Sequence, residues 1–327
     1  MANGNSITNL TINGGTVGGA DIQTHYYHNA GTIPINMNGG ILKLGERPPS
    51  GRPINSRSAP IIVSAAATTT AQILGVTANA TLAIRDGTTQ TFNVGDGTQA
   101  VDLLVDVIIS QNNGVSGILK DGSGTLRLTR ASAYTGATTV AGGAWIGPVR
   151  QPAGVIAAAS APAFAGGILN LGNNAGASAQ TLGNPTLAAN SGRSTVSVVP
   201  NGGTGTTLAL GATRTPNPGA TVLFDLSAGT PATAVVASNP ALSNGVIGGY
   251  ATVRDNTGTG FATVSAGSVV RYTGGSVLAA GSSKRHHQLH QHALRSGLFR
   301  GHPDPDGRGA RRQHAGHRHG RGRRAWI

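Results

Sequence analysis

A pair of aliphatic residues separated by one residue recurs along the chain and constrains its fold more than any other feature. In an extended strand, side chains alternate between the two faces, so both aliphatic residues of each pair point the same way. The pattern therefore predicts short strands with one buried face. The five segments are 41–44 (Ile-Leu-Lys-Leu), 81–84 (Thr-Leu-Ala-Ile), 125–128 (Thr-Leu-Arg-Leu), 168–171 (Ile-Leu-Asn-Leu) and 207–210 (Thr-Leu-Ala-Leu).

Glycine, asparagine and aspartate separate these segments, and two of the segments are flanked by glycines at 39–45 and 166–172. Such flanks suit tight corners where φ can be positive. A short strand with one apolar face cannot bury that face alone, so the pattern favours successive coils stacked in parallel, a β-solenoid. An antiparallel β-sandwich is the alternative. It usually has a more aromatic core than a chain with 4% aromatic residues can provide.

Two segments need separate treatment. Residues 98–110 contain a run of Val, Leu and Ile that could be read as a helix. The run is rich in β-branched residues and is bounded by Gly97 and by the turn at 112–114, which predicts a strand. Residues 147–165 are rich in proline and alanine, and we expect a loop or an irregular coil there.

The composition limits the kinds of chemistry available. Charged residues make up 11% of the chain, against roughly a quarter in ordinary soluble proteins, so hydroxyls and amides must form most of the surface. The 51 glycines show no three-residue period, which excludes collagen, and the recurrent aliphatic clusters argue against simple disorder. Cysteine is absent, which excludes disulfides and thiolate sites.

The net charge of +13 is unevenly distributed. Residues 283–327 contain 11 basic and 2 acidic residues and eight of the ten histidines. We therefore divide the chain into a β-solenoid region, 1–282, and a disordered Arg/His-rich tail, 283–327. The Arg and His residues of the tail are not interleaved with stacking aromatics and show no recognition-helix pattern, so we expect no nucleic-acid binding. Binding of nucleic acid through this tail is kept as an alternative.

A change of reading frame is one explanation for the tail. Residues 286–292 are His-His-Gln-Leu-His-Gln-His. If they are encoded by CAC, CAA and CTA codons, reading one nucleotide later gives Thr-Thr-Asn-Tyr-Thr-Asn-Thr, which matches the composition of the rest of the chain. A genuine disordered basic tail is the other explanation.

One segment, residues 117–143, carries an ordered set of fixed positions. They are Lys-x-Gly-x-Gly-x-Leu-x-Leu, then Tyr-x-Gly-x-Thr and a closing Gly, at Lys120, Gly122, Gly124, Leu126, Leu128, Tyr134, Gly136, Thr138 and Gly142. This segment resembles the autotransporter-associated β-strand repeat. The resemblance implies a right-handed parallel β-helix in the passenger region of a type V secreted protein. It also implies a location at the bacterial surface or outside the cell, and a C-terminal outer-membrane barrel that carries the passenger there.

The sequence departs from the family pattern in places. Arg130 stands where a small residue is usual, and Ala144-Trp145 replaces the usual Thr-Leu, which puts the regularity of the next coil in question. The tail shows no series of ~10-residue alternating strands with aromatic girdles, the start shows no signal-peptide pattern, and no apolar run is long enough to span a bilayer. We therefore expect a fragment of a passenger, either an internal piece or a truncated reading frame.

Each motif position has a structural interpretation. Gly122 and Gly124 permit a sharp turn before Leu126 and Leu128 enter the interior, and Gly136 gives a second turn before a strand at 138–140. We expect Tyr134 to lie over a corner with its hydroxyl in water.

The sequence contains few residues in patterns that indicate a catalytic or binding site. No phosphate-binding loop, zinc-protease motif or nucleophile elbow occurs, so no cofactor, metal or catalytic residue is predicted. His25 and His28, in Thr-His-Tyr-Tyr-His-Asn, form a weak candidate ligand pair. The acidic residues that could support a polysaccharide-cutting enzyme through paired carboxylates are Asp86, Asp96, Asp102, Asp106 and Asp121. We favour a non-catalytic stalk or adhesive surface and keep the enzyme as an alternative.

Overall fold

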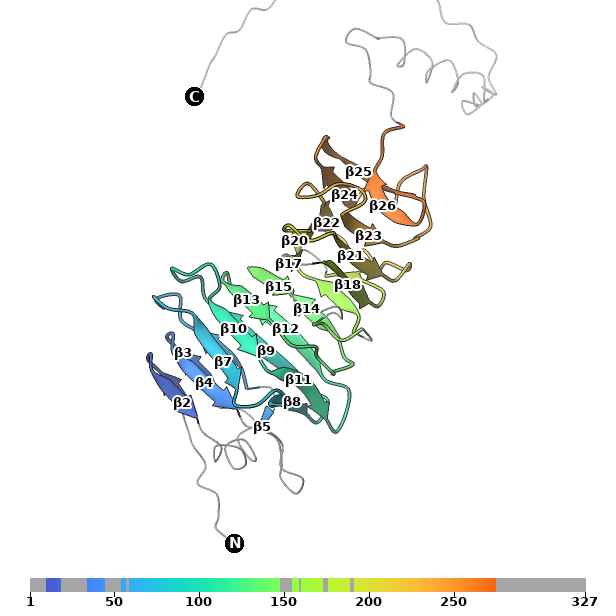
Figure 1. Cartoon of the computed structure of the whole chain (residues 1–327). Coiled ribbons are helices and arrows are strands. Elements are labelled where there is room, and N and C mark those ends of the chain that lie inside the picture. Colours follow the sequence, from blue (N-terminus) through green and yellow to red (C-terminus); the bar gives the residue numbers. More distant parts are fainter. Residues whose placement is uncertain are drawn as a thin grey trace, which may run out of the picture. The chain divides into compact units, whose positions relative to one another are not determined.

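The computed structural model describes residues 10–18, 34–44, 54–56, 59–147, 155–158, 160–172, 176–188 and 191–274. All regular secondary structure in these ranges is β-strand (Figure 1). The chain divides into two units, 1–274 and 275–327, and the described residues all belong to the first. The predicted basic tail and the pair His25 and His28 lie outside the described residues. Among the described residues, no helix has the length and apolar character needed to cross a membrane.

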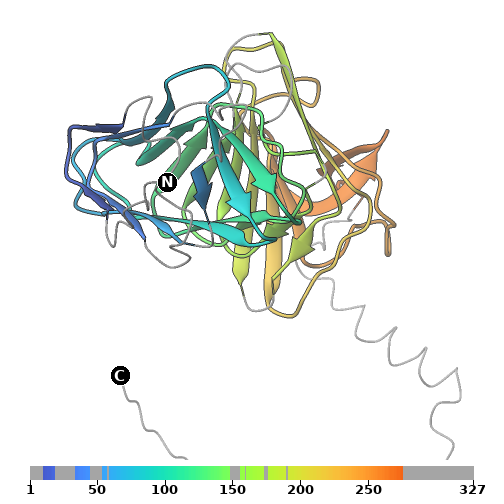
Figure 2. The same ribbon diagram turned by 90° about the horizontal axis from the view of Figure 1, so that it is seen from below.

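An eight-stranded sheet is formed from successive coils, with every neighbouring pair parallel. It appears with the other sheets in Figure 1 and, from below, in Figure 2. Its strands, in spatial order, are β1 (Leu10–Ile12), β3 (Ile35–Met37), β6 (Ile61–Val63), β9 (Thr89–Val94), β12 (Gly117–Asp121), β14 (Thr138–Val140), β16 (Pro162–Phe164) and β19 (Thr186–Leu187).

A fifteen-stranded sheet contains four of the five recurrent aliphatic segments, and the fifth, 81–84, lies in a third sheet described below. Ten consecutive strands of this sheet pair in parallel, in the order β2 (Thr16–Gly18), β4 (Ile41–Leu44), β7 (Ala71–Gly75), β10 (Leu103–Asp106), β13 (Thr125–Leu128), β15 (Ala144–Gly147), β17 (Ile168–Gly172), β20 (Gly192–Val199), β22 (Ala220–Asp225) and β24 (Ala251–Asp255). The sheet continues through the antiparallel strands β25 (Gly258–Ser265) and β26 (Ser268–Arg271) to β23 (Ala234–Ala237), β21 (Gly205–Leu210) and β18 (Ala177–Leu182).

A third, shorter sheet consists of β11 (Ile108–Asn112), β8 (Thr81–Arg85) and β5 (Ile54–Ser56), all parallel. The chain visits the sheets in a repeating order, for example β7, β8, β9 and then β10, β11, β12. Each visit stacks a new strand on its predecessor in the same sheet. The predicted parallel β-solenoid is confirmed, and the β-sandwich alternative is wrong for the described residues.

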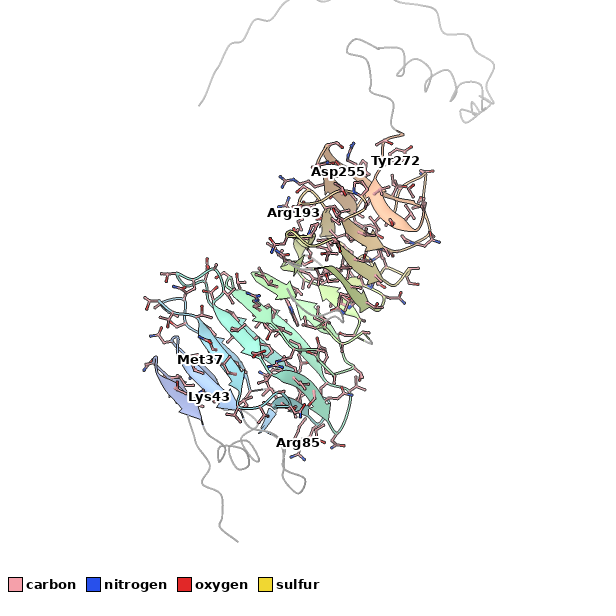
Figure 3. All side chains as sticks on the ribbon, in the orientation of Figure 1. Met37, Lys43, Arg85, Arg193, Asp255 and Tyr272 are labelled. Carbon is pink, nitrogen blue, oxygen red and sulfur yellow. The ribbon has the colours of Figure 1, made fainter. Side chains whose placement is uncertain are left out.

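The alternating burial predicted for the aliphatic pairs is confirmed. The second and fourth residues of all five segments are buried, and the residue between them is exposed or half-buried in every case except Ala83. Met37 is buried and Lys43 is exposed, and both residues are labelled in Figure 3. In-register pairing stacks the buried residues into columns, in which successive strands are about 4.8 Å apart. One column, with every member at most 1% exposed, is Ala71, Leu103, Leu126, Trp145, Leu169, Val196, Phe224 and Val253.

The less regular segments behave differently from one another. Residues 98–110 contribute to β10 and β11, so the prediction of strand is confirmed. The prediction of a loop over 147–165 is wrong at its end, because residues 162–164 form β16 and pair in parallel with β14. Ala144 and Trp145, which replace the usual Thr-Leu of the family pattern, keep register with β13 and β17, so the next coil remains regular.

The stack of parallel strands ends in antiparallel strands after β24. β24 turns back into β25 and then β26 as antiparallel neighbours, and β26 pairs with β23 at Ala237 and Ser268. The exposed edge that a last parallel strand would present is therefore paired within the long sheet.

Candidate functional site

The side chain of Lys120 is completely buried at the end of β12. In the ladder it is paired with Phe92 of the preceding coil and Val140 of the following coil, both buried. Its Nζ donates hydrogen bonds to the carbonyl oxygens of Asp121 at 2.8 Å, Gly122 at 2.9 Å and Gly142 at 3.1 Å. The ammonium group therefore ties the turn after β12 to the turn that follows β14 in the next coil.

The environment of Lys120 disfavours its charge. Burial lowers the pKa of Lys120 to about 8, and the negative charges of Asp121 and Asp102 offset only part of this effect. The three carbonyl acceptors match the three N–H donors of an ammonium group. The group is fully used in holding two turns together, which is a structural arrangement rather than that of an accessible base or nucleophile.

Asp102 lies at the start of β10 and is 2% exposed. Its Oδ1 accepts a hydrogen bond from the Gly97 N–H at 2.8 Å, and its Oδ2 accepts one from the Thr125 N–H at 2.8 Å. This carboxylate joins the turn before β10 to the first residue of β13 in the next coil. Its local role resembles that of Lys120, with the charges reversed.

The predicted turn glycines are required by close backbone contacts. Gly122 has φ of +76°, where a side chain would be strained. A Cβ on Gly124 would clash with the carbonyl oxygen of Gly95 in the preceding coil. A Cβ on Gly136 would come within 2.5 Å of the Ser116 carbonyl oxygen. These positions need glycine because neighbouring coils approach one another there.

Tyr134 corrects one of our expectations. Its side chain is completely buried rather than wet at a corner. Its hydroxyl lies 2.7 Å from Thr138 Oγ1, which lies 2.7 Å from Ser160 Oγ, and Ser160 Oγ donates to the Gly136 carbonyl at 2.7 Å. Because Ser160 gives its proton to a carbonyl, the protons must run from Tyr134 to Thr138 to Ser160. The hydroxyl is satisfied by this chain instead of by water.

Burial raises the pKa of Tyr134, and the hydrogen bonds with Thr138 and Ser160 offset only part of the increase. Thr138 was predicted to begin the next strand and does so as the first residue of β14. The predicted interior positions Leu126 and Leu128 are also confirmed, at 0% and 1% exposure. Sequence reasoning missed Ser160, which lies in the segment expected to be an irregular loop.

Four of the five candidate acidic residues accept hydrogen bonds that hold turns or neighbouring coils in place. Asp86 has φ of +56° in a turn and accepts a hydrogen bond from Asn113 Nδ2 at 3.0 Å. Asp121 accepts one from the Gly122 N–H at 2.8 Å, and Asp102 binds the two backbone amides described above. Asp96 is exposed. Within the described ranges, no group of three or more His, Asp or Glu residues could hold a metal ion.

Asp106 explains the unusual Arg130. Arg130 Nε donates to Asp106 Oδ1 at 2.7 Å, and Thr129 Oγ1 donates to the same oxygen at 2.5 Å. Burial raises the pKa of Asp106, but these hydrogen bonds and the charge of Arg130 outweigh it, so the pKa lies below its ordinary value. The two residues are 24 positions apart and meet because they lie on successive coils.

Arg214 is a half-buried cation that sequence reasoning missed. Its guanidinium donates to the Ala212 carbonyl at 3.2 Å and to Ser238 Oγ at 3.0 Å, and lies 6.0 Å from the ring centroid of Phe224. Burial lowers the pKa of Arg214. Like Lys120, it is held by backbone carbonyls near a corner, and no short motif in the sequence marks it.

Comparison with known proteins gives one match. The family model of the passenger-associated-transport-repeat matches residues 118–144, which is displaced by one residue from the segment singled out above. No curated protein and no solved structure matches the chain. The repeat and the parallel β-solenoid together fit a repeat protein of the autotransporter passenger type.

Proposed function

Because a passenger-associated-transport-repeat lies within a parallel β-solenoid, we propose that this protein is a non-catalytic stalk or adhesive surface, displayed on or released from a bacterial cell by type V secretion. The observation that supports this proposal best is the set of three hydrogen bonds that Lys120 Nζ donates to carbonyl oxygens in the turns of two successive coils. The residues of the repeat hold one coil to the next, so the repeat builds length rather than a reaction chamber.

The placement of the other reactive side chains supports the same proposal. Asp102 binds two backbone amides, and Asp106 binds an arginine. The hydroxyls of Tyr134, Thr138 and Ser160 are linked by hydrogen bonds in a chain that ends at the Gly136 carbonyl oxygen. A polysaccharide-cutting enzyme remains the alternative. Asp86, one of its candidate carboxylates, lies in a turn and accepts a hydrogen bond from Asn113, and this arrangement does not favour the enzyme.

Surface display is tested by adding proteinase K to intact cells that produce the protein and probing with an antibody against the solenoid. We expect the signal to be lost from intact cells while a cytosolic marker enzyme survives. Protection of the solenoid until the cells are lysed would contradict the proposal.

The non-catalytic part needs a separate assay. Purified protein is incubated with a panel of bacterial and host polysaccharides, and new reducing ends are measured over time. We expect none above a heat-denatured sample. Release of reducing ends that disappears in Asp86→Asn or Asp96→Asn would establish the enzyme instead.

A further inference from the structure

A cavity opens where the last strand leaves its neighbour. β26 and β23 are paired only at Ser268 and Ala237. An antiparallel ladder that continued from this pair would place Arg271 opposite Ala234. The strands instead diverge, and a cavity of about 60 Å³ lies between them, lined by residues 234–235 on one side and 268–271 on the other. Leu226, residues 229–231, Val253 and residues 255–256 complete its lining.

The walls of this cavity are mainly aliphatic. Leu226, Ala234, Val253 and Val269 line it and are buried. A cavity needs about 10–15 Å³ of such volume to hold one water-sized group, so about 60 Å³ admits a small group of a few non-hydrogen atoms. The site suits a small group that carries at least one methyl.

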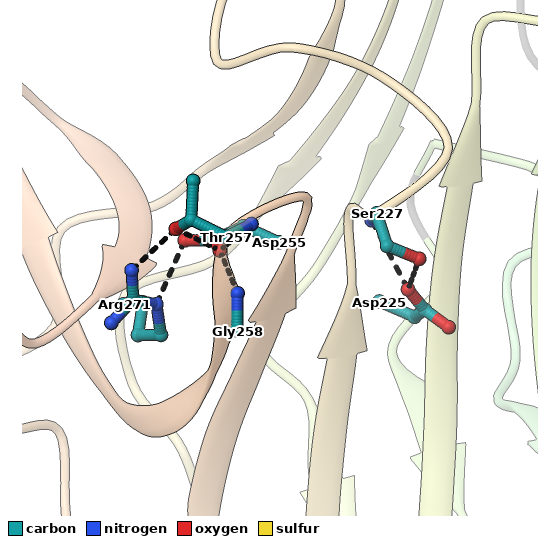
Figure 4. A network of polar contacts seen from close by, with 6 residues as sticks. All are labelled: Asp225, Ser227, Asp255, Thr257, Gly258 and Arg271. Carbon is teal, nitrogen blue, oxygen red and sulfur yellow. Dashed lines mark hydrogen bonds and ion pairs between the residues drawn. The ribbon is translucent and has the colours of Figure 1, made fainter.

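Thr230, Asn256 and Ser268 are uncharged polar residues of the lining. The charged part of the lining is an ion pair fixed by several contacts (Figure 4). Arg271 Nε donates to Asp255 Oδ2 at 3.0 Å, and Arg271 Nη2 donates to Thr257 Oγ1 at 2.5 Å. The other carboxylate oxygen of Asp255 accepts from the N–H groups of Thr257 at 2.8 Å and Gly258 at 2.9 Å. Within the described residues, the side-chain hydrogen bonds of Arg271 are made by Nε and Nη2, and Nη1 makes none.

These features restrict the charge of a ligand. Arg271 and Asp255 together are neutral, so an anion would meet the carboxylate and a cation would meet the guanidinium. A neutral group with a hydrogen-bond acceptor avoids both conflicts and gives the free N–H groups of Arg271 a partner.

We propose that this cavity binds the acetamido group of an N-acetylated ligand, with the methyl against Val253 and Val269 and the carbonyl oxygen facing Arg271. An acetamido group has four non-hydrogen atoms, a methyl, no charge and a strong acceptor, which matches the size and lining of the cavity. N-acetylated sugars and acetylated peptides both present this group. The inference deepens the adhesive part of the proposed function and rests on that proposal for its biological meaning.

The test compares N-acetylglucosamine, glucosamine and an N-acetylated dipeptide amide as probes of the purified full-length protein. Saturation-transfer NMR identifies the buried group, and titration calorimetry gives the affinity. We expect N-acetylglucosamine to bind with Kd on the order of millimolar, as befits so small a contact, with the strongest saturation at its acetyl methyl. Glucosamine is expected to bind at least tenfold more weakly. The dipeptide arm decides between a sugar and a peptide source.

Variants locate the site. Arg271→Met removes the free donors, and Val270→Phe, at a half-buried lining residue, reduces the volume. Each should weaken binding at least tenfold while the circular dichroism spectrum is retained. Arg254→Met is the matched control, because Arg254 lies on the neighbouring strand, pairs with Asp225 at 3.8 Å and does not line the cavity. Equal binding of glucosamine, no saturable binding, or full binding by Arg271→Met would overturn the proposal. The assay needs only purified protein, so its failure is distinct from a failure of surface display.

Discussion

The hydroxyl chain at Tyr134 predicts a large effect from a change of very similar shape. Thr138→Val keeps the volume of the side chain but removes the oxygen that joins Tyr134 to Ser160 at 2.7 Å on each side. All three residues are at most 1% exposed, so water cannot replace the lost partner. The variant leaves the Tyr134 hydroxyl as a buried donor without an acceptor.

The size of the effect follows from two losses. Leaving one buried donor unsatisfied costs about 1–3 kcal/mol, and losing the second hydrogen bond adds roughly 1 kcal/mol. We expect Thr138→Val to lower the free energy of unfolding by about 2–4 kcal/mol. The measurement is urea-induced unfolding of the full chain followed by circular dichroism, with a lower midpoint at an unchanged slope.

The next residue of the same strand provides the control. Thr139 is half-buried on the outer face of β14, paired with Leu119 and Ala163. Thr139→Val is the same chemical change, and we expect it to alter stability by at most about 0.5 kcal/mol. Similar effects from the two variants, or a loss under 0.5 kcal/mol for Thr138→Val, would refute the reasoning.

A double-mutant cycle tests whether the hydroxyls of Tyr134 and Thr138 interact. Tyr134→Phe removes the donor that Thr138→Val leaves unsatisfied, so the double variant should be less destabilised than the sum of the two single variants. We expect a coupling energy of about 1–2 kcal/mol, within the usual range for contacting residues. Strict additivity would show that the two hydroxyls do not interact.

Three further predictions concern turns, pH and the surface. Gly124→Ala should cost more than about 3 kcal/mol in a thermal melt, because its Cβ would clash with backbone, whereas Gly172→Ala, whose Cβ meets nothing within 4 Å, should be close to neutral. The pKa of Lys120 is lowered from 10.5 to about 8 in the folded protein. Between about pH 8 and 10.5 the unfolded chain therefore binds more protons at this residue than the folded protein does, and the free energy of unfolding should rise with pH. Lys120→Met should abolish that rise in unfolding experiments across this range. Above pH 10 the raised pKa of Tyr134 acts in the opposite direction, and stability should fall there because only the unfolded chain loses the phenolic proton. Arg130→Ala should lower the free energy of unfolding by under about 1 kcal/mol and lose its difference from the parent protein at 1 M salt, since its ion pair is about one-third exposed.

The sequence predicted the stacked coils because that information is local. The alternation in Thr-Leu-Arg-Leu at 125–128 is enough to place Leu126 and Leu128 inside, and glycine spacing is enough to locate corners. The contacts of Tyr134 were not predictable in this way. Its chain of hydroxyls ends at Ser160, 22 residues beyond Thr138, and only the register between coils brings them together.

The same limitation applies to the charged residues. Lys120 and Gly142 were both recognised as motif positions, but the hydrogen bond between them depends on one coil lying directly upon the next. The partner of Arg130 is Asp106, one coil earlier, and Arg214 has no sequence signal at all. Coil lengths vary along the chain, so counting residues cannot align these side chains without the structure.

The antiparallel end described above also limits self-association. Open-ended filaments grow when one surface of each subunit binds a different, complementary surface on the next subunit. In the long sheet, the strand that would receive an incoming copy, β24, is already bonded to β25. Two molecules could therefore not join head to tail by continuing this sheet, and the fold limits fibre growth at that end without a separate blocking domain.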